Sequence, residues 1–253
     1  MAVTGRTERR VTAEAPPWRL TLLGSWQLRG AQDLLQVANN GQRLLALLGL
    51  RGPCDRSYVS GVLWPECSDQ HAFGNLRATL SRLRRRNLTG LLDTYDRSLW
   101  LDPGVAVDAR ELADTATEVL DGAYSEPRRH TLHRLTGEDL LMGWYDDWVL
   151  IEREQLRHLR LHALETLSGQ FLNSHDAASA VEAGLAAVTI EPLRESAHRA
   201  LIRAYLAEGN KAEALKQYAR LRHLIKAEFD AEPSALVTDL LGWVVGETPE
   251  PKG

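Results

Sequence analysis

The pattern of hydrophobic and polar positions is most regular between Ser68 and Arg86, the stretch around which the neighbouring segments are arranged. The hydrophobic members recur at intervals of three and four, which predicts a helix with one apolar face: Phe73, Leu76, Leu80 and Leu83. At 100° per residue, the other side of this helix carries His71, Asn75, Ala78, Arg82 and Arg85. Ser68 or Asp69 can cap the first turn, and the cationic end of the stretch suits the helix dipole.

Basic residues dominate the polar side of this helix. No acidic residue follows Asp69 within the stretch, and five arginines fall between positions 77 and 86. Arginine can bridge O6 and N7 of guanine, and asparagine can bridge N6 and N7 of adenine, so the pattern favours a helix that enters the major groove of DNA. A solvated amphipathic helix with a basic end would show the same pattern, and the flanking segments distinguish the two.

Two shorter apolar-periodic segments precede the basic helix, and a hairpin follows it. Gln42–Leu50 and Arg56–Trp64 predict two helices, with Asp55 as the N-cap of the second. Leu91–Thr94 and Leu99–Leu101 predict two strands joined by a turn. Helix, helix, basic helix and hairpin is the order of a winged helix-turn-helix, whose third helix reads the groove.

Segments with β-strand patterns frame these helices and set the limits of the first domain. Trp18–Arg29 and Leu34–Val37 predict a small antiparallel sheet before the first helix, and Gly104–Val107 can add a closing strand. Such a leading sheet is typical of the winged-helix class found in response regulators. The sequence therefore predicts a disordered tail at residues 1–17 and a winged-helix DNA-binding domain at residues 18–107.

From residue 108 onward the segments have helical patterns. The expected helices cover residues 110–120, 128–135 and 149–172, and a repeat with an offset of 34 residues follows. In that repeat Leu172 aligns with Leu206, and 34 residues is the tetratricopeptide period. The chain as a whole is thus predicted to be mainly α, with an all-α tetratricopeptide-like domain at residues 108–246 and a tail at residues 247–253. Such a domain binds protein partners, although helix packing or dimerisation explains the repeat as well.

Aromatic and acidic residues gather in one short segment before the longest helix, with the sequence GWYDDW at residues 143–148. Trp144 and Trp148 could form a ligand box, but packing of the long helix explains them more simply. Asp146 and Asp147 could hold a metal ion, but capping of the next helix is the simpler role because no third ligand stands nearby.

Motifs for catalysis and for cofactor binding are missing from the sequence. His158 and His162 have a spacing that zinc sites use, but HExxH is absent and no carboxylate cluster completes a site. G-x-S-x-G and glycine-rich phosphate loops are absent as well. The sequence therefore predicts no enzyme, no cofactor and no metal.

Composition and charge predict a soluble chain with two halves of opposite sign. Hydrophobic residues make up 44% of it, no apolar run is long enough to span a membrane, and the start lacks the apolar core of a secretory signal. Cys54 and Cys67 match no zinc pattern, which favours the reducing cytoplasm. Residues 1–107 hold 14 Lys and Arg against 9 Asp and Glu (net +5), whereas residues 108–253 hold 16 against 25 (net −9). This asymmetry suits one domain on DNA phosphates and another that contacts protein.

The order of these elements resembles the Streptomyces antibiotic regulatory protein family, in which a response-regulator-type winged helix precedes a bacterial transcriptional activator domain. The stretches that carry the resemblance are Leu22–Gly24, Asn75–Arg77, Leu80–Arg84, Gly143–Glu154, Pro192–Glu195 and Glu232–Ser234. The chain departs from the family at the hairpin, where a Gly-Tyr pair is usual near the tip and Asp96–Trp100 stands here.

The resemblance implies a transcriptional activator that binds direct repeats near promoters of secondary-metabolite gene clusters and recruits RNA polymerase holoenzyme. Its partners would be double-stranded promoter DNA, RNA polymerase and further copies of itself on DNA, in the cytoplasm on the nucleoid and not at a membrane. The alternative is a helical-repeat adaptor that binds protein partners and whose winged helix does not bind DNA.

The residues expected to contact DNA lie on the basic helix and at the hairpin tip: His71, Asn75, Arg77, Ala78, Ser81, Arg82, Arg84, Arg85 and Arg97. Asn75 and Arg82 are expected to reach bases, because both project from the side opposite the apolar face. Arg97 is expected to reach phosphates or an adjacent minor groove, and Arg84 and Arg85 to reach phosphates where the helix leaves the groove.

Overall fold

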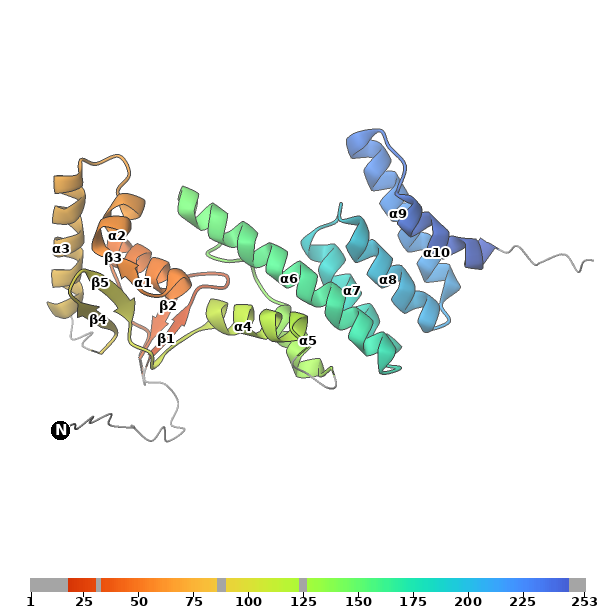
Figure 1. Ribbon diagram of the computed structural model, residues 1–253, viewed down its shortest axis with the longest axis horizontal. Helices are drawn as coiled ribbons and strands as arrows, with labels where there is room; N and C mark the ends of the chain where they lie inside the picture. Colours follow the sequence, from red (N-terminus) through yellow and green to blue (C-terminus); the bar gives the residue numbers. More distant parts are fainter. Residues whose placement is uncertain (1–17, 31–32, 86–89, 123–126, 246–253) are drawn as a thin grey trace, which may run out of the picture. The chain divides into compact units, whose positions relative to one another are not determined.

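The computed structural model describes four stretches of the chain: residues 18–30, 33–85, 90–122 and 127–245. The tails expected at residues 1–17 and 247–253 lie outside the described residues. The chain divides into two compact units, and Figure 1 labels the helices and strands of both. In the described part, the first unit holds residues 18–21 and 26–107, and the second unit holds residues 22–25 and 108–245.

The first unit combines short strands with a three-helix group. Its elements are β1 (Trp18–Thr21), β2 (Gln27–Arg29), α1 (Asn39–Arg51), β3 (Cys54–Asp55), α2 (Arg56–Leu63), α3 (Asp69–Arg85), β4 (Leu92–Tyr95), β5 (Ser98–Leu101) and β6 (Val105–Val107). Helix α1 contacts α2, α3 and β5, and the run from Leu44 to Gly49 is buried on every side. The leucines of α1 therefore form the centre of this unit.

The strands form two three-stranded sheets, in the orders β2-β1-β6 and β3-β5-β4. The first sheet is mixed and not purely antiparallel as predicted, because β6 returns parallel to β1 with Leu20 opposite Val107. The expected strand at Leu34–Val37 is reduced to one bridge between Leu34 and Arg29. The side-chain amide of Gln42 in α1 donates to the carbonyl oxygen of Val37 at 2.8 Å, so this carbonyl is bound by the helix and not by a neighbouring strand.

Helices α2 and α3 form the helix-turn-helix pair, and β4 and β5 form the hairpin that follows it in the chain (Figure 1). The predicted N-cap of α2 is confirmed, since the carboxylate of Asp55 accepts a hydrogen bond of 2.7 Å from the backbone N–H of Ser57. Strand β3, which the sequence pattern does not predict, joins the start of α2 to β5 by pairing Cys54 with Leu99.

The second unit is all-α apart from one isolated bridge among its described residues. Its helices are α4 (Asp108–Leu120), α5 (Arg129–Leu135), α6 (Asp147–Asn173), α7 (Ala177–Ile190), α8 (Glu195–Ala207), α9 (Lys211–Phe229) and α10 (Ala235–Val245). Each of α6, α7, α8 and α9 contacts the next, so the helices stack in chain order (Figure 1). With the helical majority of the chain, this arrangement confirms the predicted fold class.

The predicted 34-residue repeat is present in the backbone. Helices α6 and α8 end 34 residues apart, and α7 and α9 begin 34 residues apart. The two connecting turns match, because His175 and Gly209 both have positive φ, at 60° and 82°. Asp176 and Asn210 then cap α7 and α9 in the same way, each accepting from a backbone N–H three residues on.

A four-residue segment of the leading stretch, Leu22–Ser25, belongs to the second unit. The sequence assigns this segment to the first domain. Its backbone instead pairs with residues 139–142, through hydrogen bonds of 2.7 to 2.8 Å that Gly24 and Leu22 make with them. The carboxylate of Asp108, the first residue of α4, accepts from the backbone N–H groups of Leu22 and Leu23. These nonlocal bonds, which no local pattern reveals, decide where the segment belongs.

The turn before α6 is fixed by an arginine of α6 itself. The guanidinium of Arg153 donates to the carbonyl oxygens of Leu140, Leu141 and Trp144, at 2.7 to 3.1 Å. Trp148 is buried, which supports the predicted packing role of the aromatic residues in this turn. Asp146 holds the N-cap position, but its side chain accepts no hydrogen bond from the helix amides, so the predicted capping by this carboxylate is wrong.

Candidate nucleic-acid interface

Helix α3 presents one buried face and one exposed face. Leu76, Leu80 and Leu83 are buried as predicted, whereas Phe73 is only half-buried. Ala72 and Thr79 are buried too, and the Thr79 hydroxyl donates to the carbonyl oxygen of Asn75 at 2.8 Å. The helix is therefore held by a continuous strip of small and branched side chains against the rest of the first unit.

Most of the residues predicted to contact DNA are exposed along this helix. The exposed ones are His71, Arg77, Ala78, Ser81, Arg82, Arg84 and Arg85. Asn75 is half-buried, and its amide nitrogen lies 4.0 Å from the sulfur of Cys67. Nδ1 of His71 lies 2.9 Å from the hydroxyl of Ser68, so this imidazole is held at the start of the helix.

Three small residues and one arginine lie along the centre of the exposed face. At about 100° per residue, the direction opposite the buried strip passes through Gly74, Ala78, Ser81 and Arg85. Arg82 lies on one flank of this line, and Arg77 and Arg84 lie on the other. A helix with this surface can approach the floor of a groove closely along its centre while guanidinium groups extend on both sides.

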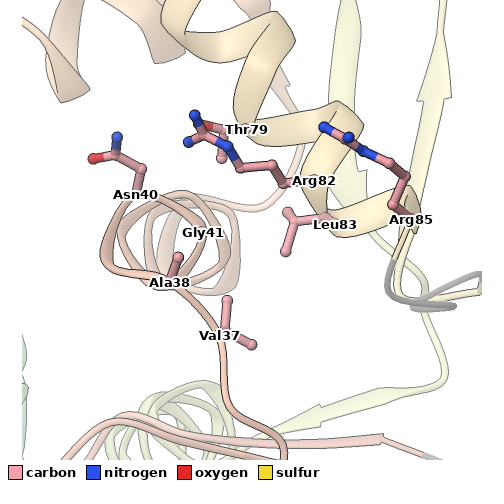
Figure 2. A pocket seen from close by; sticks show the side chains of 8 residues that line it. All are labelled: Val37, Ala38, Asn40, Gly41, Thr79, Arg82, Leu83 and Arg85. Atoms are coloured by element: carbon pink, nitrogen blue, oxygen red, sulfur yellow. The ribbon is translucent and has the colours of Figure 1, made fainter.

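On the flank of Arg82, a hollow of about 340 Å³ separates α3 from the start of α1. Its lining residues are Val37, Ala38, Asn40, Gly41, Thr79, Arg82, Leu83 and Arg85. Figure 2 shows the guanidinium of Arg82 at the rim on the side of Asn40, whereas the guanidinium of Arg85 extends away from it. None of the lining residues is acidic.

On the other flank, a shallower depression of about 400 Å³ lies between α3 and the start of α2. Its lining contains four arginines together with two residues of the α3 face: Arg56, Arg77, Arg84, Arg85, Leu80 and Ser81. So many guanidinium groups repel one another unless anions come between them, and the phosphates of a nucleic-acid backbone are anions that guanidinium groups bind well.

The hairpin tip adjoins this second flank. The backbone N–H of Arg56 donates to the carbonyl oxygen of Arg97 at 2.9 Å, and Arg97 itself is exposed. The hydroxyl and backbone N–H of Ser57 hold the pKa of the Asp55 carboxyl below its ordinary value, and the charge of Arg97 adds to this. Asp55 thus stays ionised as the cap of α2 and offsets part of the positive charge beside the tip.

The other chemically suggestive residues do not converge on a site. His158 pairs with Glu154 at 2.7 Å, and Nε2 of His162 lies 3.4 Å from Arg194, so the two imidazoles have different partners. Within the described ranges, no cluster of three or more His, Cys, Asp or Glu could hold a metal ion. The helices of this same part of the chain include none long and apolar enough to cross a membrane.

Comparison with known proteins identifies relatives of both parts of the chain. The profile of the bacterial transcriptional activator domain matches residues 102–242. The regulatory protein AfsR of Streptomyces coelicolor is 29% identical over 87% of this chain, and AfsR of Streptomyces griseus is 28% identical over 91%. These alignments cover 23% and 25% of the relatives, so the chain spans about a quarter of their length.

The fold is also found in a solved structure, that of Mycobacterium tuberculosis EmbR in complex with a low-affinity phosphopeptide. The two align with a TM-score of 0.71 over 90% of this chain and 65% of the other, at 17% identity. The likeness of fold therefore extends over the first unit, most of which lies outside the family profile.

Proposed function

Because the chain belongs to the family of the bacterial transcriptional activator domain, with the element order of the Streptomyces antibiotic regulatory proteins, we propose that it is a sequence-specific DNA-binding activator of transcription. The first unit is its DNA-binding domain and the second its activator domain. In this proposal α3 lies in the major groove, and the hairpin of β4 and β5 lies on the neighbouring backbone.

The exposed face of α3 carries this proposal. Its flanks end in depressions bordered by Arg82 on one side and by Arg56, Arg77 and Arg84 on the other. The two phosphate backbones that border a major groove would lie against these two flanks, one on each side of the helix. Counterions released from the phosphates would favour binding. Ala78 and Ser81 between the flanks leave the helix free to approach the base edges, where Arg85 is the nearest arginine.

The second unit acts on protein partners in this proposal. Residues 108–253 carry a net charge of −9, which DNA phosphates would repel, and stacked helical repeats expose extended surfaces suited to protein. We assign it to contact with RNA polymerase holoenzyme and to assembly of protomers on adjacent direct repeats, at promoters of secondary-metabolite genes. The family resemblance is the support for these partners and for a site of action on the nucleoid in the cytoplasm.

The test is a selection of duplexes from a random library by the full chain, followed by fluorescence anisotropy with the selected duplex at several salt concentrations. The selected duplex is expected to bind at least about 1,000-fold more tightly than a shuffled one. The logarithm of its affinity should fall linearly with the logarithm of salt concentration, by about 0.9 for each phosphate contacted.

One substitution tests whether α3 makes the contact with DNA. Ala78→Leu adds a bulky side chain at the centre of the exposed face, so it should weaken binding to the selected duplex by about tenfold or more without lowering stability. Ala212→Leu makes the same change at an exposed position of α9 and should leave affinity unchanged. Failure to select any sequence, with equal weak binding to all duplexes, would favour the adaptor whose winged helix does not bind DNA.

The arrangement of the sites is tested by footprinting on the selected promoter. Protection of two tandem repeats in one orientation is expected, with protomers placed head to tail. A single inverted repeat would contradict it, because that arrangement demands a two-fold symmetric dimer.

A further inference from the structure

The hollow between α1 and α3 has the chemistry of a small-molecule site. Val37, Gly41 and Leu83 give it an apolar floor, with Val37 and Leu83 buried beside the start of α1. Its volume of about 340 Å³ lies within the range of ligand pockets in proteins. A backbone phosphate held at the rim would leave this floor uncovered, whereas a ligand with an apolar body would fill it.

The rim of the hollow is cationic and carries guanidinium N–H groups that are available to donate hydrogen bonds. Within the described residues, the guanidinium of Arg82 makes no hydrogen bond or ion pair, and Arg85 makes one long bond of 3.4 Å from Nε to the carbonyl oxygen of Ser81. Each guanidinium carries five N–H donors in a fork that matches a carboxylate or phosphate. Helix α1 adds its positive end, since Ala38 at the N-cap offers no side-chain acceptor to the first amides.

We propose that this hollow binds a small organic anion with an apolar body, such as an aryl or alkyl carboxylate, and that the bound anion competes with DNA for Arg82 and Arg85. The carboxylate sits at the rim on the guanidinium of Arg82, the side chain of Arg85 turns toward it from its position in Figure 2, and the apolar body covers the floor. The competition rests on the proposed function, whereas the binding does not. A chain with this site would leave its DNA when such a compound accumulates.

The experiment follows the ¹⁵N-labelled full chain by nuclear magnetic resonance, without DNA, as 4-phenylbutyrate is added. The backbone amide of Gly41 and the Nε–H of Arg82 and Arg85 are expected to shift and saturate. Two matched probes separate the contributions: 4-phenylbutanol has the same body without charge, and inorganic phosphate has charge without a body. Each should bind about tenfold more weakly than 4-phenylbutyrate.

A pair of variants locates the site. Arg82→Gln should lower the affinity for 4-phenylbutyrate by about tenfold. Arg77→Gln, which removes an exposed arginine from the opposite flank of α3, should change this affinity less than twofold. Equal affinity for the three probes, tighter binding of inorganic phosphate, or an Arg82→Gln variant that binds as the wild type does would each overturn the proposed site.

Competition is measured separately, by adding 4-phenylbutyrate to the complex with the selected duplex. Release of the duplex, at concentrations that saturate the Gly41 shift, supports the competition. Simultaneous binding of both would overturn it while leaving the DNA-binding function intact. If no duplex binds at all, the proposed function fails, and the shifts of Gly41 and Arg82 still decide whether the anion site exists.

Discussion

At the scale of single residues, adjacent arginines at the end of α3 have different surroundings. Arg85 lies near the centre of the exposed face, whereas Arg84 lies toward Arg56 and Arg77 on the flank. Arg85→Ala should therefore relax the preference at one base position, at a cost of about 1–3 kcal/mol on the preferred sequence. Arg84→Ala should weaken all sequences alike and lower the salt slope by about one unit.

Binding of both variants to a panel of duplexes with single base changes is the measurement. Arg97→Ala is expected to behave as Arg84→Ala does, since the hairpin tip adjoins the same flank. A uniform loss in Arg85→Ala, together with a changed base preference in Arg84→Ala, would mean that α3 is rotated in the groove relative to this proposal.

How far the sequence predicts this face depends on three residues. The 3.6-residue period correctly identifies which arginines are exposed, because charged side chains avoid burial. It places the centre of the face near Arg82, about 70° from where the structure has it. Ala72 and Thr79 are buried, and Phe73 is only half-buried, so a pattern that counts large apolar residues misplaces the strip. Hydroxyl bonding of Thr79 within its own helix makes its burial possible.

At the scale of elements, a glycine sets the contact between α7 and α8. A Cβ built on Gly184 would lie 2.9 Å from the Cα of Leu201, which is backbone and cannot rotate away. Gly184→Ala should therefore lower the free energy of unfolding by about 1–2 kcal/mol, because overpacking outweighs the better helix propensity of alanine. Gly169→Ala in α6, where a Cβ meets nothing within 4 Å, should raise it by up to about 1 kcal/mol.

Denaturant unfolding of the two variants beside the wild type measures both changes. Equal stabilisation by the two substitutions would show that α7 and α8 are free to move apart. The same glycine explains why the first repeat matches the tetratricopeptide pattern less well, since Gly184 stands where the second repeat has Tyr218.

A buried histidine joins α8 to α9 and makes stability depend on pH. His198 is fully buried, with Nε2 2.9 Å from the carbonyl oxygen of Pro192 and Nδ1 2.8 Å from the amide nitrogen of Gln217. Since a carbonyl only accepts, Nε2 carries the proton and Nδ1 accepts from Gln217. Burial lowers the pKa of this imidazole below its ordinary value, so the folded protein keeps it neutral.

The sign of the pH effect follows from that lowered pKa. As pH falls below about 6.5, the unfolded chain takes up a proton at His198 that the folded chain does not. The free energy of unfolding therefore decreases toward acid pH and has its full value above about pH 6.5. Thermal unfolding between pH 7.5 and 5.5 should show a smaller acid loss in His198→Gln than in the wild type. The exposed His223→Gln is the control, and an unchanged slope in His198→Gln would exclude this origin.

Local signals predict some elements of the fold better than others. Helices α2 and α3 and the hairpin are marked by caps, breakers and periodicity within a few residues, and the predictions lie within a few residues of the observed bounds. The parallel pairing of β6 with β1 joins segments more than 80 residues apart, and neither segment carries a local sequence signal for it. Helix α1 begins three residues before the predicted Gln42, because Asn39 and Asn40 are poor helix formers that the period does not count.

At the scale of the whole molecule, the charge of the chain is split along the same line as its units. Residues 1–107 produced alone are expected to select the same DNA sequence as the full chain, because the proposed contacts all lie there, and to fail in activating transcription of a reporter. The fragment should also unfold at a lower temperature, because the backbone of Leu22 loses its hydrogen bonds to Asp108 and Leu141.

Selection from the same library and thermal unfolding of both proteins provide the comparison. A different selected sequence would show that the second unit takes part in base recognition. Activation of a reporter by the fragment would show that residues 108–253 are not the activating part.

The crossing of Leu22–Ser25 into the second unit has a consequence for domain exchange. The chain passes between the units three times, after Thr21, after Ser25 and after Val107, so no single cut separates them. A chimaera that takes a foreign DNA-binding unit in place of residues 1–107 would also import a foreign partner for Asp108 and for residues 139–142. Grafts that keep Leu22–Ser25 with their own second unit should therefore fold where simple fusions at Val107 do not.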